Sequence, residues 1–156
     1  MNTKPILGML LGDGAGVGAE IIAKLAASGF YDEYCRPVVI GDARIFQRGA
    51  EICGLEIPMQ VISRVEDADW SKGIPVLDQR DLDPEEVPYA QINVKSGQAC
   101  LDMLRTGIEL YKDGKIEGFC FAPLNKQAMI KAGCPFESEH HYMAHLFQHT
   151  EPFGEI

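Results

Sequence analysis

The sequence is short of positive charge and has no long apolar segment. Its 14 Lys and Arg residues are outnumbered by 23 Asp and Glu residues, which gives a formal net charge of −9. No cluster of cations is available to neutralise a phosphate backbone, which argues against nucleic acid as a partner. No run approaches the roughly 20 apolar residues that a membrane span requires. We therefore expect a cytoplasmic protein with neither a nucleic-acid nor a membrane partner.

Disulfide and zinc-knuckle signatures are also missing. The cysteines are odd in number, widely spaced and never in a C-x-x-C pair, so neither kind of framework is indicated. The apolar stretch near the N-terminus is too short for a signal peptide, and Asp13 ends it. A reducing compartment fits these features.

Short apolar runs alternate with amphipathic segments along most of the chain. This alternation predicts parallel βαβ units, and hence an α/β fold with a layered α/β/α arrangement and a mostly parallel sheet. Between residues 64 and 95 the periodicity fades, which predicts irregular or edge structure around one short strand. The expected strands are 5–11, 36–42, 59–63, 74–78 and 117–123, and the expected helices are 19–29, 42–54, 96–114, 125–133 and 138–149.

Each expected helix has start or stop signals and an apolar face. The predicted N-caps are Asp42, Ser96, Asn125 and Ser138, and the predicted stops are Gly29, Gly54, Gly114 and Gly133. The predicted buried faces are Ile21, Ile22, Leu25 and Ala26 in one helix, Ile45, Phe46, Ile52 and Cys53 in the next, and Ala99, Cys100, Met103, Leu104, Ile108 and Tyr111 in a third.

Four glycines stand at alternate positions between the first strand and the first helix. Gly14, Gly16 and Ala19 match the dinucleotide fingerprint G-x-G-x-x-G/A, with Asp42 as the acidic residue for a ribose. The match is imperfect, because Asp42 lies further along the chain than the usual distance of about 20 residues. Asp13 would also place a carboxylate beside the pyrophosphate. The alternative is a structural turn that needs positive φ and close packing.

All four histidines lie within residues 140–149. His141, His145 and His149 have i, i+4, i+8 spacing, which could hold a metal with Glu139 nearby. The alternative is a half-buried helix face with Leu146 and Phe147 in the core. His140 and His141 fall in the first turn after Ser138, where helix amides favour an anion.

Two further charged residues are candidates for the same kind of site. Lys126 falls in the first turn of an expected helix, where a cation is disfavoured unless an anion pairs with it. It either lines a site or is a solvated surface lysine. Asp13 either contacts a ligand or caps its own turn.

Three segments resemble the 4-hydroxythreonine-4-phosphate dehydrogenase family in order and spacing. Residues 10–22 (LLGDGAGVGAEII) are similar to its N-terminal signature G-D-P-A-G-I-G-P-E, with Gly14 and Ala19 where the family usually has proline. Residues 94–133 resemble its middle, and residues 135–146 (PFESEHHYMAHL) stand at its G-H-T-E segment. The resemblance implies a fold like that of isocitrate and isopropylmalate dehydrogenases. It also implies that Gly14 and Gly16 form a structural turn and not a cofactor site, because the family holds its nicotinamide cofactor mainly with the later half of the chain.

The resemblance implies an enzyme of pyridoxine biosynthesis that acts on a small phosphorylated hydroxy acid, such as 4-phosphohydroxy-L-threonine. Its reaction would be an NAD-dependent oxidation followed by decarboxylation. His140 falls on the family's substrate-contacting histidine, and His141 replaces the threonine beside it. The wider stretch is more similar to the branch that acts on 4-phospho-D-threonate or D-erythronate. The expected substrate-contacting residues are His140, His141, Lys126 and Asp13.

The reaction also requires NAD and a divalent metal (Zn, Mg or Co), whose ligands the resemblance places mostly beyond residue 156. No cofactor or metal residue is assigned within 1–156. The chain is expected to be a partial one, the N-terminal half of a two-domain homodimeric dehydrogenase, because the end TEPFGEI has a turn-like PFG leading into another strand. Residues 1–156 alone are then expected to be inactive. Two alternatives stay open, a non-catalytic anion-binding α/β module and a true dinucleotide-binding protein.

Overall fold

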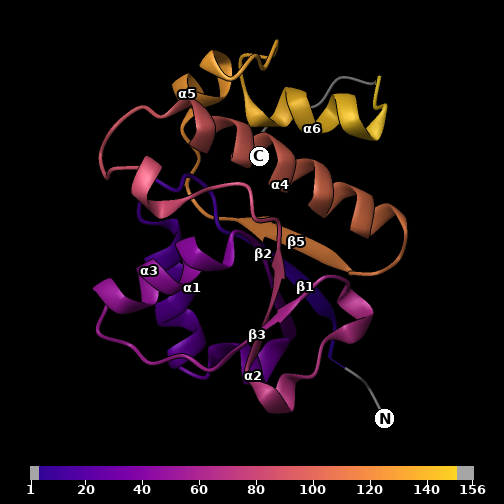
Figure 1. The fold of residues 1–156 in the computed structure, drawn as a ribbon. Coiled ribbons are helices and arrows are strands. Elements are labelled where there is room, and N and C mark those ends of the chain that lie inside the picture. Colours follow the sequence, from indigo (N-terminus) through magenta and orange to yellow (C-terminus); the bar gives the residue numbers. More distant parts are fainter. Residues whose placement is uncertain (1–3, 151–156) are drawn as a thin grey trace.

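The computed structural model describes residues 4–150. Within them one parallel sheet has the strand order β3-β4-β2-β1-β5 (Figure 1). The strands are β1 (Ile6–Leu10), β2 (Arg36–Gly41), β3 (Met59–Ile62), β4 (Ile74–Asp78) and β5 (Gly118–Phe121). Every predicted strand is present, and the predicted α/β class with a parallel sheet is confirmed.

Helices cover both faces of the sheet (Figure 1). On one side α1 (Gly18–Ala27) packs against α3 (Ala43–Ile52), and the short α2 (Phe30–Tyr34) follows α1. On the other side α4 (Val94–Lys112) crosses β1, β2 and β5, and it is itself covered by α5 (Lys126–Lys131) and α6 (Glu139–Phe147). Three short 3₁₀ turns, Val65–Asp67, Trp70–Lys72 and Pro84–Glu86, interrupt the loops. The layered α/β/α arrangement is therefore as predicted, whereas α2 was not expected.

Most of the predicted helix starts are confirmed, and one is wrong. The side chains of Asp42, Asn125 and Ser138 accept hydrogen bonds from amides in the first turns of α3, α5 and α6. The N-cap of α4 is Asn93, whose side chain accepts from the Ser96 amide at 3.1 Å. Ser96 instead lies inside the helix and is fully buried. The helix therefore starts three residues earlier than predicted, with Asn93 in place of Ser96 as its N-cap.

Several side chains predicted to be buried are exposed. Ile21 and Leu25 in α1, Ile52 in α3 and Tyr111 in α4 are each more than a third exposed. In α3 the buried contact is made instead by Gly49, where an added Cβ would lie 2.6 Å from the Cβ of Ala19. Small residues bring these two helices close together, so the larger apolar residues at their margins stay outside the contact.

Two strands occupy positions in the sheet that differ from expectation. β4 was predicted as a short strand surrounded by irregular or edge structure, and it lies inside the sheet, between β2 and β3. Pro75 is tolerated there because pairing of β4 with β2 begins only at Val76. β5 was predicted to be a buried strand, but it is the last strand of the described sheet and its Cys120 is exposed.

No helix within residues 4–150 has the length and apolar character needed to cross a membrane. The turn expected around residues 152–154 lies outside the described residues.

Candidate functional site

The glycine turn after β1 is built for close packing. Gly12 has φ 73°, and a Cβ at Gly18 would lie 2.0 Å from the Leu11 carbonyl oxygen. At Gly14 an added Cβ would lie 2.5 Å from a methyl carbon of Leu82. Positive φ and contact between neighbouring segments therefore account for these glycines.

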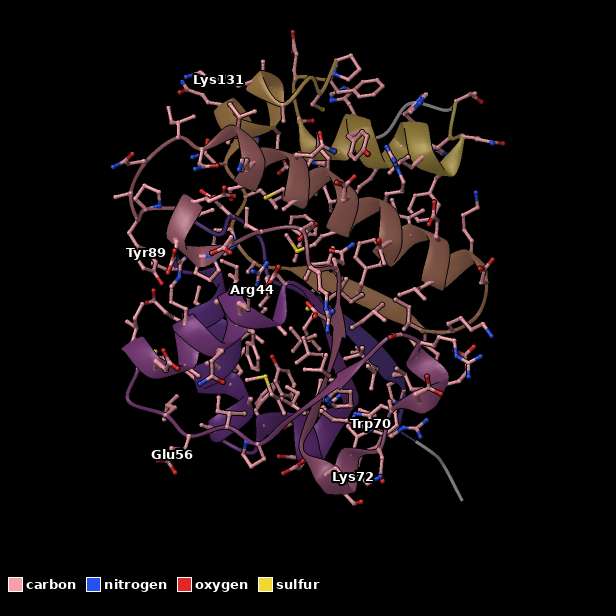
Figure 2. The ribbon with its side chains drawn as sticks, in the orientation of Figure 1. Arg44, Glu56, Trp70, Lys72, Tyr89 and Lys131 are labelled. Atoms are coloured by element: carbon pink, nitrogen blue, oxygen red, sulfur yellow. The ribbon has the colours of Figure 1, made fainter. Side chains whose placement is uncertain are left out.

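Asp42 does not have the role that the dinucleotide fingerprint gave it. Its carboxylate is buried and accepts hydrogen bonds from the Arg44 amide and guanidinium and from the Leu82 amide. Burial alone would raise the pKa of Asp42, but these hydrogen bonds hold it below the ordinary value of 3.8. Figure 2 labels Arg44 where it projects from the start of α3. The carboxylate that should hold a ribose is thus already occupied by the protein.

Asp13 is held by its own loop and by α4. Its Oδ1 accepts from the Ala15 amide at 3.0 Å and from the Ser96 hydroxyl at 2.5 Å. The Ser96 hydroxyl oxygen in turn accepts from the Gly14 amide at 2.8 Å. Asp13 therefore has the turn-capping role that the sequence left open, and its contact with substrate stays a prediction. Sequence reasoning missed Ser96 because the two residues are 83 positions apart.

Arg48 of α3 fixes the outer side of the same turn. Its guanidinium donates to the Gly14 carbonyl oxygen at 2.5 Å and to the Val87 carbonyl oxygen at 2.9 Å. It also lies 4.4 Å from the centre of the Tyr89 ring, which Figure 2 labels. The turn is thus held to α3, α4 and the loop before α4.

The ends of β1 and β5 bring the glycine turn close to the segment that leads into α5. The Asp13 amide donates to the Pro123 carbonyl oxygen at 3.0 Å. From Pro123 the chain continues directly into α5, whose first residue is Lys126. Candidates from both halves of the chain therefore lie at the same edge of the sheet, where parallel α/β folds commonly bind ligands.

Lys126 has the anionic partner that its position requires. Its ammonium lies 3.4 Å from Oε2 of Glu139 in the first turn of α6, and its side chain is 54% exposed. The Glu139 side chain is 12% exposed, and its Oε1 lies 3.8 Å from Nδ1 of His140. Glu139 therefore joins Lys126 and His140 into one charged cluster, which we call the Lys126 cluster.

The two adjacent histidines do not share a pocket. His140 lines an open groove of about 650 Å³ between α4, α6 and β5, together with Tyr111, Phe119 and Met143. His141 borders a separate pocket of about 180 Å³ beside Pro135–Glu137, and its Nδ1 lies 2.7 Å from the Ser138 hydroxyl oxygen. The expected pair of imidazoles at one helix start is therefore divided between two surfaces.

The three-histidine stripe is not formed. α6 ends at Phe147, and Gln148 has φ 57°, so His149 leaves the helix that carries His141 and His145. The His145 ring packs against Phe136 with its centre 5.1 Å away. Among residues 4–150 no group of three or more His, Cys, Asp or Glu could hold a metal. Phe147, expected in the core, is 39% exposed, while Leu146 is half-buried.

The Lys126 cluster can bind an anion. An ammonium and an imidazole beside one carboxylate offer hydrogen-bond donors to a phosphate or carboxylate. The Lys126 ammonium and the His140 imidazole are accessible to solvent, whereas Asp13 is buried. The segment from α5 to α6 is therefore the part of the candidate site most accessible to a ligand.

Comparison with known proteins identifies the family of this chain. A family model described as pyridoxal phosphate biosynthetic protein PdxA matches residues 33–155. The chain belongs to the PdxA family. A protein of Oceanobacillus iheyensis, provisionally named D-threonate 4-phosphate dehydrogenase, is 37% identical over 99% of this chain and 46% of its own length. D-threonate 4-phosphate dehydrogenase of Cupriavidus necator is 31% identical over 91% of this chain and 43% of its own length.

Solved structures of the PdxA family share the fold. A 4-hydroxythreonine-4-phosphate dehydrogenase from Burkholderia phymatum superposes with a TM-score of 0.91 and 34% identity, over 96% of this chain and 46% of that chain. The enzyme of that name from Klebsiella pneumoniae gives a TM-score of 0.85 and 27% identity, over 93% of this chain and 45% of that chain. The present chain thus spans just under half the length of these relatives.

Proposed function

We propose that this chain supplies the substrate-holding part of an NAD-dependent dehydrogenase of a small phosphorylated hydroxy acid. The observation that carries the proposal is the Lys126 cluster, in which Glu139 holds Lys126 and His140 beside each other at the solvent-exposed end of the sheet. When a ligand phosphate or carboxylate arrives, Lys126 can exchange its contact with Glu139 for a contact with the stronger anion. His140 and His141 are proposed to contact the rest of the substrate, with Asp13 fixing the neighbouring turn.

The first candidate substrate is D-threonate 4-phosphate. Relatives that are 37% and 31% identical carry that name. His141, in place of the family's usual threonine, also favours this branch. The second candidate is 4-hydroxythreonine 4-phosphate, favoured by the Burkholderia phymatum structure at 34% identity. Both molecules offer a phosphate and a carboxylate to the cluster and a secondary alcohol for oxidation.

The described residues do not by themselves fit a metal or a nicotinamide cofactor. No group of three ligating side chains stands together in residues 4–150, and Asp42 is fully engaged with Arg44 and Leu82. The proposal therefore gives this chain only the binding and orientation of the substrate. NAD, a divalent metal (Zn, Mg or Co), a homodimeric state and a cytoplasmic location are proposed for the whole protein, in line with the family resemblance.

A calorimetric titration of D-threonate 4-phosphate into the purified chain tests the proposal. Loss of one charge-assisted contact weakens binding by about 1.5 to 3 kcal/mol, which is about tenfold or more in Kd. We expect that loss for Lys126→Met. Lys131→Met, at the other end of α5 (Figure 2), makes the same change of charge away from the cluster and should stay within about twofold.

Two controls separate the proposal from its alternatives. D-threonate, which lacks the phosphate, should bind much more weakly than its 4-phosphate. A simple anion-binding module would instead bind inorganic phosphate as tightly as the sugar-acid phosphate. Equal binding by wild type and Lys126→Met would contradict the proposed role of the cluster.

A further inference from the structure

An apolar groove lies between α1, α2 and β5, on the side of the sheet opposite α4. It has a volume of about 350 Å³, and none of its lining side chains is charged. Two of these side chains, predicted from helical spacing to be buried, are open to solvent: Ile21 is 41% exposed and Leu25 37%. Phe30 and Tyr34 of α2 extend the surface, at 52% and 54% exposed. Contiguous exposed apolar surface of this kind marks an interaction site.

Tyr31 supplies one unsatisfied polar group beside the groove. The residue is 6% exposed, and its hydroxyl has no hydrogen-bond partner among the described residues. Burial raises the pKa of Tyr31, with Cys120 and Cys35 adding to the effect, so the phenol stays protonated and able to donate. Both of these cysteines also line the groove. A buried phenol of this kind normally donates to an acceptor, and residues 4–150 do not supply one.

The strand beside the groove is also incomplete. β5 pairs with β1, and within residues 4–150 no other strand pairs with it. Phe119 of the same strand lines the separate groove that contains His140. Two grooves and an unpaired strand edge therefore meet at β5, and exposed edges of this kind are normally covered in folded proteins.

We propose that the groove, together with the outer edge of β5, docks the part of the PdxA-family fold that lies outside the 46% of the relatives matched by this chain. The docking segment would be apolar, with one acceptor for the Tyr31 hydroxyl and an extended strand for β5. The chain spans 46% of the relatives' length, so an equally large polypeptide is available to cover this surface in those proteins. The uncharged lining fits an intramolecular or permanent contact. This inference rests on family membership and not on the proposed reaction.

Co-expression tests the proposal. The chain is produced in the same cells as the portion of the Oceanobacillus iheyensis relative that it does not match, and a one-to-one complex is expected in size-exclusion chromatography with light scattering. Phe30→Asp should weaken the complex at least tenfold. Ile130→Asp is the matched control, since Ile130 is also 52% exposed but lies on α5 outside the groove. No complex, or equal effects of the two variants, would overturn the proposal.

Tyr31→Phe gives a second test, which removes only the hydroxyl and keeps the aromatic ring. Within residues 4–150 the hydroxyl has no hydrogen-bond partner, so its removal should leave the chain's thermal stability unchanged or higher while weakening the complex. A loss of stability in the chain alone would overturn the role given to the hydroxyl.

Thiol labelling locates the contact. Cys120, exposed beside the groove, should react with maleimide in the chain alone and be protected in the complex, while Cys53 at the end of α3 should react equally in both. If the chain alone forms a dimer that protects Cys120 and that Phe30→Asp dissociates, the occupant is a second copy and the proposal is wrong.

Discussion

The glycine turn at residues 12–18 and the segment at residues 125–141 meet at the same edge of the sheet but are held in opposite ways. The turn is closed: Asp13 is buried and bonded to Ser96 and Ala15. The second segment is open, because Lys126 is more than half exposed and forms an ion pair with Glu139. The difference shows that a conspicuous motif can be a tightly packed turn, while the more exposed charged side chains lie in a less conspicuous segment.

The largest expected effect tests how tightly the closed turn is packed. Gly18→Ala places a Cβ 2.0 Å from the Leu11 carbonyl oxygen, and backbone cannot move aside easily. We expect a loss of about 3 kcal/mol in the free energy of unfolding, more than the roughly 1 kcal/mol gained in helix propensity. Urea denaturation measures it. Gly118→Ala, whose Cβ meets only Leu7 at 3.5 Å, should change stability by less than about 0.5 kcal/mol, and equal effects would contradict the packing account.

Asp42→Asn tests the electrostatics of the closed region next. The ionised carboxylate accepts from Arg44 and Leu82, so its loss should cost about 2 to 3 kcal/mol at pH 7. Because its folded-state pKa lies below 3.8, this stabilisation is present above that pH and is lost as the pH falls through the lowered value. Denaturation of both proteins across pH 2 to 7 should therefore give curves that converge in acid. A constant difference at every pH would rule out the ionised carboxylate as the source.

Ser96→Ala removes the hydroxyl that joins Asp13 to the Gly14 amide. We expect a loss of about 1 to 2 kcal/mol, since two buried groups lose a partner. Hydrogen exchange should show faster opening of the Gly14 amide in particular. Ser71→Ala, on an exposed 3₁₀ turn, is the control for loss of a serine hydroxyl. An unchanged Gly14 amide would mean that the bond does not hold the turn.

The smallest effect on stability is expected in the open segment. Lys126→Met breaks one ion pair in which Lys126 is 54% exposed and Glu139 is 12% exposed, and we expect a loss of no more than about 1 kcal/mol. Thermal unfolding should therefore change little, even though ligand binding is weakened about tenfold or more. A destabilisation comparable to that of Gly18→Ala would show that Lys126 is structural and would remove the contrast between the two regions.

The fold could be predicted from local patterns because each strand and most helix ends have their own signals. Asp42, Asn125 and Ser138 cap the helices that the sequence assigned to them. Periodicity predicts which residues share the apolar face of a helix, but not how much of that face other elements bury. Ile21 and Tyr111 have helical spacing like their buried neighbours, but nothing within residues 4–150 packs over them fully.

The candidate site was predicted less completely, because its contacts join distant parts of the chain. Lys126 was expected to need an anion, but the sequence did not identify Glu139 as that anion. The partnership of Asp13 with Ser96 had no local signal at all. His140 and His141 are neighbours in sequence, yet successive helical residues point about 100° apart, which accounts for their separation into different pockets.

The most direct test of the open segment is an NMR titration of the imidazole resonances with D-threonate 4-phosphate. All histidines of the sequence lie between residues 140 and 149, so few signals need assignment. The account predicts that His140, beside Glu139, shifts in a saturable way, while His145, packed on Phe136, stays in place. A titration that moves His145 and leaves His140 unchanged, or that moves neither, would contradict the placement of the substrate at the Lys126 cluster.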